Sequence, residues 1–213
     1  MQLQLSCVAD ALGSATVESG GNCVVAAVRF GPVQREAGPL SVSVEFTGDS
    51  DAEQSECTGD ALTRALIPAL LEEALPKAQI SVKVLVLKYD GAELAAAILA
   101  AALALVNAGV ATTALVSAGT CFVHVSKVGP AKLGQNPRGE DDADADAVVV
   151  VASLGLEEVT LLRCVGALAR ADLEKASAVA MQQAQSARTA MQEALAQSKT
   201  AGPPKNAKAP LRS

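Results

Sequence analysis

Isoleucine and valine recur at every second position between Ile80 and Val86, with Ser, Lys and Leu between them. This period of two predicts a strand that turns one face toward a core. The Asp90-Gly91 pair that follows predicts a tight turn, because glycine tolerates positive φ and aspartate hydrogen-bonds its own backbone. We also expect Asp90 to cap the next helix.

The segment from Glu93 to Asn107 consists almost entirely of Ala, Leu, Ile and Val. This composition predicts a helix without a polar face, which other elements must cover on most sides. Its uninterrupted apolar run is shorter than the roughly 20 residues that a membrane span requires. We therefore expect a buried core helix that ends at Gly109.

The N-terminal part of the chain has the pattern of short strands. Two β-prone runs, residues 13–18 and 23–28, flank a Gly-Gly pair, which predicts a hairpin. Residues 40–46 alternate cleanly as a third strand, which a Gly-Pro pair separates from the second. We expect these three strands to form a meander.

A helix is predicted after the acidic, polar segment 47–56, which has the composition of a surface loop. Thr58 or Asp60 is placed to cap this helix, and Pro68 should either kink it or mark its effective start. Leucines that fall on one face of a helix predict its apolar side. They are Leu62, Leu66, Leu70 and Leu71.

The C-terminal part is predicted to contain three strands and one long helix. Residues 114–125 are β-prone, and residues 147–152 and 158–165 are predicted as two buried, paired strands. Residues 172–198 form a helix with an alanine-rich face suited to lie across a sheet. Residues 199–213 are a basic, Pro-rich tail that we expect to be disordered.

This order of elements predicts an α+β domain over residues 1–198, with mixed sheets packed against the central Ala-rich helix and the long C-terminal helix. A length of 213 residues is enough for a sizeable core. The net charge of −6 argues against a broad basic surface that would grip nucleic acid.

Five cysteines are spread singly through the chain, without a C-x-x-C pair and beside a single histidine, His124. We interpret them as reduced and mostly buried thiols of an intracellular protein, and His124 as a half-exposed structural residue. The N-terminus lacks the basic and apolar regions of a signal peptide, so the cytoplasm or nucleus is the expected compartment.

Two segments together resemble the RNase PH-like family. The first resembles the hairpin that opens such domains, and Gly31-Pro32 matches the end of its second strand. The second resembles the family's strand, Asp-Gly turn and Ala-rich helix. The residues that carry the resemblance are Gly13, Ser14, Ala15, Val17, Glu18, Gly20, Asn22, Val24, Ile80, Val82, Val84, Val86, Asp90, Gly91 and the helix end 103–110.

The resemblance implies a fold that in active members binds inorganic phosphate after the Asp-Gly turn. Those members carry Gly-Thr-Arg there, and the Arg and the helix-start amides hold the phosphate nucleophile beside an RNA end. In this chain the aligned residues are Ala92, Glu93 and Leu94. Leu94 stands at the Arg position, and Glu93 would repel phosphate.

Other functional positions of the family also depart from the pattern. Active members place an Arg near the start of the preceding helix, where this chain has Asp60, with Arg64 one turn on. The first catalytic Asp aligns best with Asn136, and Asp141 or Asp142 falls near the second acidic position. The degenerate positions are Asp60, Leu94, Asn136 and Asp142, and they imply a chain without catalytic activity.

The resemblance thus implies a structural subunit of the eukaryotic RNA exosome ring, which supports 3′-to-5′ processing and degradation of rRNA and mRNA. The implied partners are the other RNase PH-like ring subunits, RNA-binding cap subunits, associated exosome nucleases and single-stranded RNA in a shared channel. No membrane, cofactor or metal is implied, and the implied locations are the nucleus, nucleolus and cytoplasm. The compact length is most similar to the ribosomal-RNA-processing forty-six type of ring subunit, with the transport-defective-mRNA type as the alternative.

Candidate RNA-binding residues are Arg29, Arg35 and Arg64, although surface arginines commonly have no such role. The basic tail is either a nonspecific RNA contact or a solubilising segment. A rival hypothesis is a metal-dependent nuclease that uses Asp141, Asp142 and Asp144, since clustered carboxylates bind Mg²⁺. A solvated acidic loop is the simpler interpretation of that run. A third hypothesis is an unrelated small-molecule-binding α+β domain.

Overall fold

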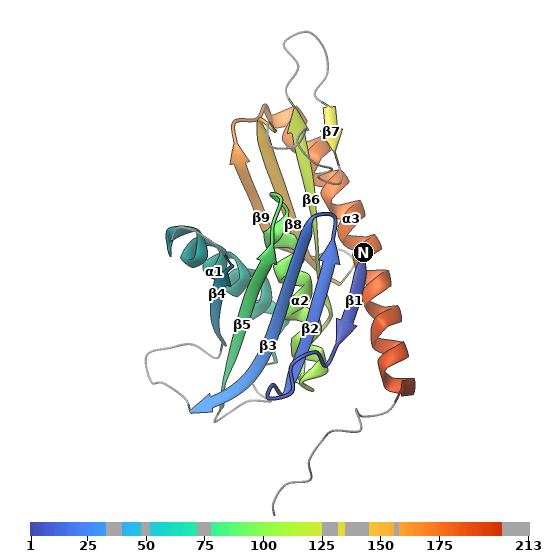
Figure 1. Cartoon of the computed structure of the whole chain (residues 1–213). Helices are drawn as coiled ribbons and strands as arrows, with labels where there is room; N and C mark the ends of the chain where they lie inside the picture. The colour runs from blue at the N-terminus through green and yellow to red at the C-terminus, as the bar shows by residue number, and fades with distance from the viewer. Residues whose placement is uncertain are drawn as a thin grey trace, which may run out of the picture.

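The computed structural model describes residues 1–32, 40–47, 52–71, 78–124, 132–134, 145–155 and 158–201. These residues form two sheets, three α-helices and one short 3₁₀ helix (Figure 1). The helices are α1 (Ala52–Leu66), η1 (Ile67–Ala69), α2 (Glu93–Asn107) and α3 (Arg170–Ala201). The strands are β1 (Gln2–Leu5), β2 (Gly13–Ser19), β3 (Asn22–Pro32), β4 (Leu40–Phe46), β5 (Ala78–Lys88), β6 (Val116–His124), β7 (Lys132–Gly134), β8 (Ala147–Leu154) and β9 (Glu158–Gly166). The α+β class predicted from the sequence is confirmed.

The first sheet has the strand order β1-β2-β3-β5-β4, so the predicted meander is wrong. β5 pairs antiparallel with β3 and parallel with β4, and it separates these two strands. The inner residues of β5 are almost completely buried, whereas the serines of β4 face solvent. The most apolar strand therefore takes an interior place in the sheet, and the more polar β4 lies at its edge.

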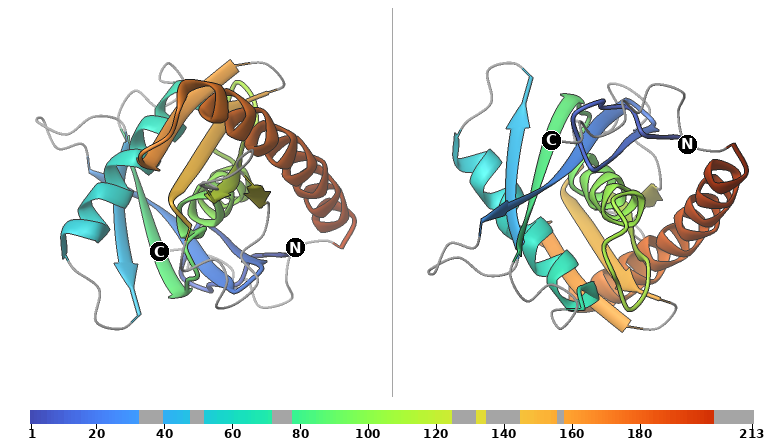
Figure 2. Two further views of the ribbon diagram at one scale, coloured as in Figure 1. Left: turned by 90° about the horizontal axis from the view of Figure 1, so that it is seen from above. Right: turned by 90° about the horizontal axis from the view of Figure 1, so that it is seen from below.

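The second sheet has the order β7-β6-β8-β9, and it lies between two helices. Alternate residues of β6 point to opposite faces, as in any strand. Ala118 belongs to the core shared with α2, whereas Cys121 packs in a second cluster with Ala176 and Ala180 of α3. Helix α2 thus lies between the two sheets, and α3 covers the outer face of the second sheet (Figure 2).

Small residues let the helices approach the sheets closely. A Cβ on Gly13 of β2 would lie 2.2 Å from the backbone nitrogen of Ala108, just after α2. A Cβ on Gly119 of β6 would lie 2.2 Å from the carbonyl oxygen of Ala180 in α3. Glycine at these positions, together with the alanine-rich helices, sets the distance between the layers.

Helix α1 begins six residues earlier than the first cap predicted from the sequence. It starts at Ala52, inside the segment predicted as a loop, with Glu53 in its first turn. An acidic residue in the first turn suits the helix dipole. The same acidic, polar composition is also typical of a loop, which is why the helix start was missed. The α-helix ends at Leu66 and Pro68 lies in η1, so the chain leaves the helical path and Leu71 is exposed rather than on the apolar face.

Other differences concern the sheet edges and the cysteines. β1 and β7 were not predicted, and β9 is mostly exposed rather than buried, because it is an edge strand. All five cysteines are free thiols, as expected, but Cys121 alone is buried. None of the helices in the described ranges combines the length and apolar character of a membrane span.

Candidate functional site

The turn between β5 and α2 is tied to the hairpin turn between β2 and β3. The Asp90 carboxylate accepts a hydrogen bond from the Gly21 backbone N–H at 2.9 Å and another from the Asn22 side chain at 2.5 Å. The Asp90 backbone N–H in turn donates to Asn22 Oδ1 at 3.1 Å. The sequence predicts that Asp90 caps α2, and this prediction is wrong. The Asp90 carboxylate binds the distant β2–β3 turn instead.

Helix α2 begins without a side-chain cap, and Ala92 is its N-cap residue. The first amides of a helix have no intrahelical partner, so this end of α2 has the geometry that favours an anion. The residues that follow remove that preference. Glu93 adds a negative charge in the first turn, and Leu94 is only 6% exposed and belongs to the main core.

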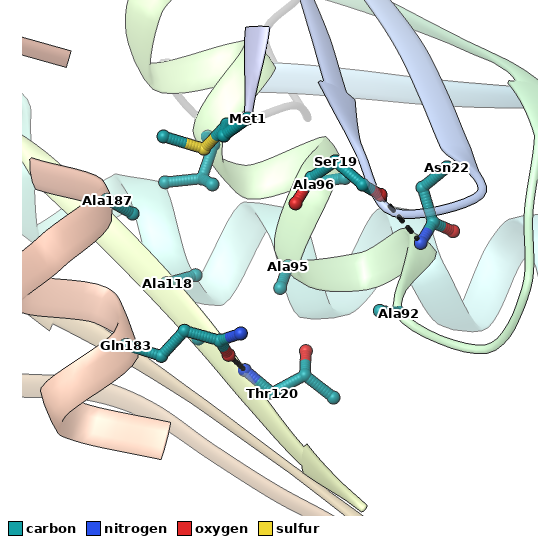
Figure 3. Close-up of a pocket in the computed structure, with 12 residues that line it drawn as sticks. Met1, Ser19, Asn22, Ala92, Ala95, Ala96, Ala118, Thr120, Gln183 and Ala187 are labelled. Atoms are coloured by element: carbon teal, nitrogen blue, oxygen red, sulfur yellow. Dashed lines mark hydrogen bonds between the residues drawn. The ribbon is translucent and has the colours of Figure 1, made fainter. Parts of the chain in front are cut away.

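A cavity of about 60 Å³ lies beside the first turns of α2, between that helix, β6 and α3 (Figure 3). Thr120 of β6 faces it, and the Thr120 N–H donates to Gln183 Oε1 of α3 at 2.6 Å. Thr120 is almost fully buried, and its hydroxyl has no hydrogen-bond partner among the described residues. The space is large enough for water, which would satisfy that hydroxyl. Its described lining contains no charged side chain that would hold a phosphate.

A second and larger cavity, of about 280 Å³, lies between α1 and β9. Asp60 and Arg64 reach it from α1, and Arg163 reaches it from β9. The Arg163 guanidinium contacts the Cys57 Sγ at 3.2 Å. Sulfur is a weak acceptor, so this contact leaves most of the guanidinium's hydrogen-bonding capacity available.

The structure separates most of the residues that the sequence proposed. Asp60 lies in the middle of α1 rather than at its start, where the chain has Glu53. Asp60 and Arg64 meet in the larger cavity, while Leu94 lies in the core. Arg29 points from the face of the first sheet opposite the core.

Several proposed residues lie outside the described ranges. They are Arg35, Asn136, Asp141, Asp142 and Asp144, so the nuclease hypothesis stays a prediction. Within the described ranges, no group of three or more His, Cys, Asp or Glu side chains is placed to hold a metal. Sequence reasoning missed Arg163, whose only signal is a charge in the middle of a mostly apolar strand.

Two thiols have perturbed acidity, and neither has the character of a nucleophile. Burial raises the pKa of Cys121 to about 11. Burial, followed by the negative charge of Glu18, also raises the pKa of Cys23. Both thiols stay protonated at neutral pH, and a nucleophilic cysteine requires the opposite shift.

Comparison with known proteins places these features in a family. Residues 1–111, just over half of the chain, match the 3′ exoribonuclease family, domain 1. The chain is 29% identical to exosome complex component Rrp41 of Pyrococcus horikoshii, over 92% of this chain and 83% of the relative. It is 26% identical to exosome complex component RRP41-like of Arabidopsis thaliana, over 93% of this chain and 80% of the relative.

The fold also matches a solved structure. The crystal structure of rice (Oryza sativa) Rrp46 superposes with a TM-score of 0.76 at 24% identity, covering 91% of this chain and 93% of the rice chain. The match in fold agrees with the sequence match, which includes the β2–β3 hairpin and the β5–α2 segment. The chain therefore belongs to the RNase PH family of 3′ exoribonuclease domains.

Proposed function

We propose that this chain is a non-catalytic structural subunit of the ring of an RNA exosome. The relatives named as exosome components align over nearly its whole length. The observation that carries the non-catalytic part is Leu94, which is buried in the core at the position where active members of the family carry the phosphate-binding Arg.

The local charge supports the same proposal. A phosphate nucleophile must be held beside a polyanionic RNA end, and this requires cations as well as helix amides. The first turn of α2 carries Glu93, and the adjacent cavity has no cationic side chain in its described lining. A carboxylate at this place opposes the binding of both phosphate and RNA.

The role that we infer is to complete the ring and part of its channel. Its partners would be other RNase PH-like ring subunits, RNA-binding cap subunits, associated exosome nucleases and single-stranded RNA that passes through the channel. The proposed locations are the nucleus, nucleolus and cytoplasm. We favour the ribosomal-RNA-processing forty-six type of subunit, and the transport-defective-mRNA type is the alternative.

Reconstitution tests this proposal directly. The chain is co-expressed with the other RNase PH-like chains of its source, and native mass spectrometry reads the composition of the assembly. Phosphorolysis is then measured on single-stranded RNA with inorganic phosphate, using the lone chain. We expect a hetero-oligomeric ring and no release of nucleoside diphosphates by the lone chain. A lone or homo-oligomeric chain that releases nucleoside diphosphates would overturn the proposal.

A further inference from the structure

Strand β9 is the least covered strand of the second sheet. It pairs with β8 on one side and forms the end of the sheet on the other (Figure 1). Helix α3 packs on β6 and β8 but does not extend over β9. Val159, Leu162 and Val165 are 50%, 52% and 55% exposed, which is unusual for three aliphatic residues on one strand.

The register with β8 assigns Leu162 and Arg163 to opposite faces of the sheet. Leu162 pairs with Val151, which packs toward α3, so Leu162 continues that face beyond the edge of the helix. Arg163 pairs with Val150, which belongs to the core shared with α2, so Arg163 points to the opposite face and into the cavity beside α1. The face of β9 toward α3 is therefore open, whereas the opposite face is open only at the cavity that separates it from α1.

The cavity between α1 and β9 has an unbalanced charge. Arg64 and Arg163 line it with Asp60 as the only carboxylate in its described lining. Neither arginine forms an ion pair with a described residue. The Arg163 guanidinium contacts the Cys57 sulfur instead. The cavity is thus a local cationic site in a chain whose net charge is −6.

We propose that the β9 surface, made of Val159, Leu162, Val165, Arg64 and Arg163, docks an extended segment of a neighbouring RNase PH-like chain. The segment pairs with the free edge of β9 through main-chain hydrogen bonds and places a carboxylate between the two arginines. The inference rests on the proposed function, because it takes the neighbour from the ring.

The observations favour a protein segment over RNA. A free strand edge offers a row of unpaired N–H and C=O groups, which another strand satisfies directly. Single-stranded RNA prefers aromatic platforms beside cations, and the described lining of the cavity contains no aromatic residue. The aliphatic side chains of β9 instead match the apolar centre of a protein interface.

Native cysteines give a test without substitution. Cys57 lies in the cavity and Cys164 lies on β9, and both are exposed, as is Cys7 near the N-terminus. Alkylation by iodoacetamide is followed by peptide mass spectrometry in the lone chain and in the reconstituted ring. We expect modification of Cys57 and Cys164 to slow by roughly tenfold or more in the ring, since thiol reactions require access. Cys7 serves as the reference thiol.

The outcomes separate the two proposals. If the ring forms and Cys57 and Cys164 stay as reactive as in the lone chain, the β9 surface is not an interface, and the proposed function stands. If no ring forms, the proposed function is contradicted, and so is the β9 interface that rests on it. Protection of Cys57 in the lone chain by a single-stranded oligouridine would overturn the inference in favour of RNA.

Two charge variants test the chemistry of the contact. Arg163→Glu reverses the charge offered to the carboxylate, and Leu162→Lys replaces one of the three exposed aliphatic side chains of β9 with a charged one. Each is expected to weaken ring assembly by roughly tenfold or more, as truncation of a central contact does. Leu85→Lys, at a 38% exposed position on the first sheet, is the matched control. Circular dichroism and thermal unfolding establish that each variant folds, and normal assembly of both folded variants would contradict the inference.

Discussion

The side chains of Asp90 and Asn22 join two turns that lie 68 residues apart in the sequence. Asp90 accepts from the Asn22 amide and the Gly21 N–H, while Asn22 accepts from the Asp90 N–H. Asn22 is 2% exposed, so its side chain has little access to water, whereas the hydrogen bond from Gly21 is exposed. The link fixes the β2–β3 hairpin against the start of α2.

Asp90→Ala removes the acceptor of this link. The Gly21 N–H and the Asn22 amide would then lose their partner, and we expect the free energy of unfolding to fall by about 1–3 kcal/mol. Urea denaturation measures this change. Asp10→Ala, at an exposed carboxylate, is the control and should stay within about 0.5 kcal/mol of the wild type. Equal stability of the two variants would show that the link contributes nothing to the free energy of unfolding.

The strands and helices with the strongest sequence patterns were predicted well. The bounds of α2 and β4 agree with the prediction, because near-continuous apolar composition and strict alternation each favour one structure. The position of β5 between β3 and β4 could not be predicted, since strand order depends on which faces pack together. The role of Asp90 was missed for the same reason: its partners are distant in sequence, and the local pattern favoured a cap.

The candidate site also has one part that could be proposed from the sequence and one part that could not. Leu94 was proposed as a degenerate position because the turn before α2 has a recognisable sequence, and the structure adds that its side chain is buried. The cavity between α1 and β9 could not be identified, since Arg64 and Arg163 are about a hundred residues apart and meet only through packing. The sequence predicted that the helix starts near Asp60, whereas α1 starts at Ala52.

Gly119→Ala tests the close approach of α3 to β6. The added Cβ would lie 2.2 Å from the Ala180 carbonyl oxygen and 2.8 Å from the Ala184 nitrogen. Because both neighbours are backbone atoms, α3 must shift, and we expect a loss of about 1–3 kcal/mol of stability. Gly31→Ala is the control, since nothing lies within 4 Å of its added Cβ. Thermal unfolding of both variants checks the prediction, and a stable Gly119→Ala chain would contradict the tight packing.

Leu94→Arg introduces the residue that the family resemblance implies at this position in active members, yet we expect no gain of activity. The wild-type side chain is 6% exposed, so the change removes core contacts and places a guanidinium against apolar neighbours. The expected loss is about 2–4 kcal/mol of stability, with no phosphate-dependent release of nucleoside diphosphates. Leu94→Met keeps the volume and should lose less than about 1.5 kcal/mol. A stable Leu94→Arg chain that phosphorolyses RNA would show that the site needs only this one cation.

The buried thiol of Cys121 makes the free energy of unfolding depend on pH in the alkaline range. Its pKa is about 11 in the folded chain, raised by burial from an ordinary value of 9.0. Between these values the unfolded chain has lost the proton and the folded chain still holds it, so the unfolded state binds fewer protons. Stability therefore falls as pH rises through this window, and the contribution is fully present below about pH 9.

Urea denaturation at several pH values from about 8 to about 11 measures this dependence, and a single thiol accounts for up to about 2 kcal/mol across the window. Cys121→Ala lowers stability at every pH by leaving a small void, but it removes the pH-dependent part that the thiol contributes. Cys7→Ala, at an exposed thiol, should retain the wild-type slope. If Cys121→Ala and the wild type lose stability equally as pH rises, the thiol is not shielded from water, and the packing between β6 and α3 is looser than the structure indicates.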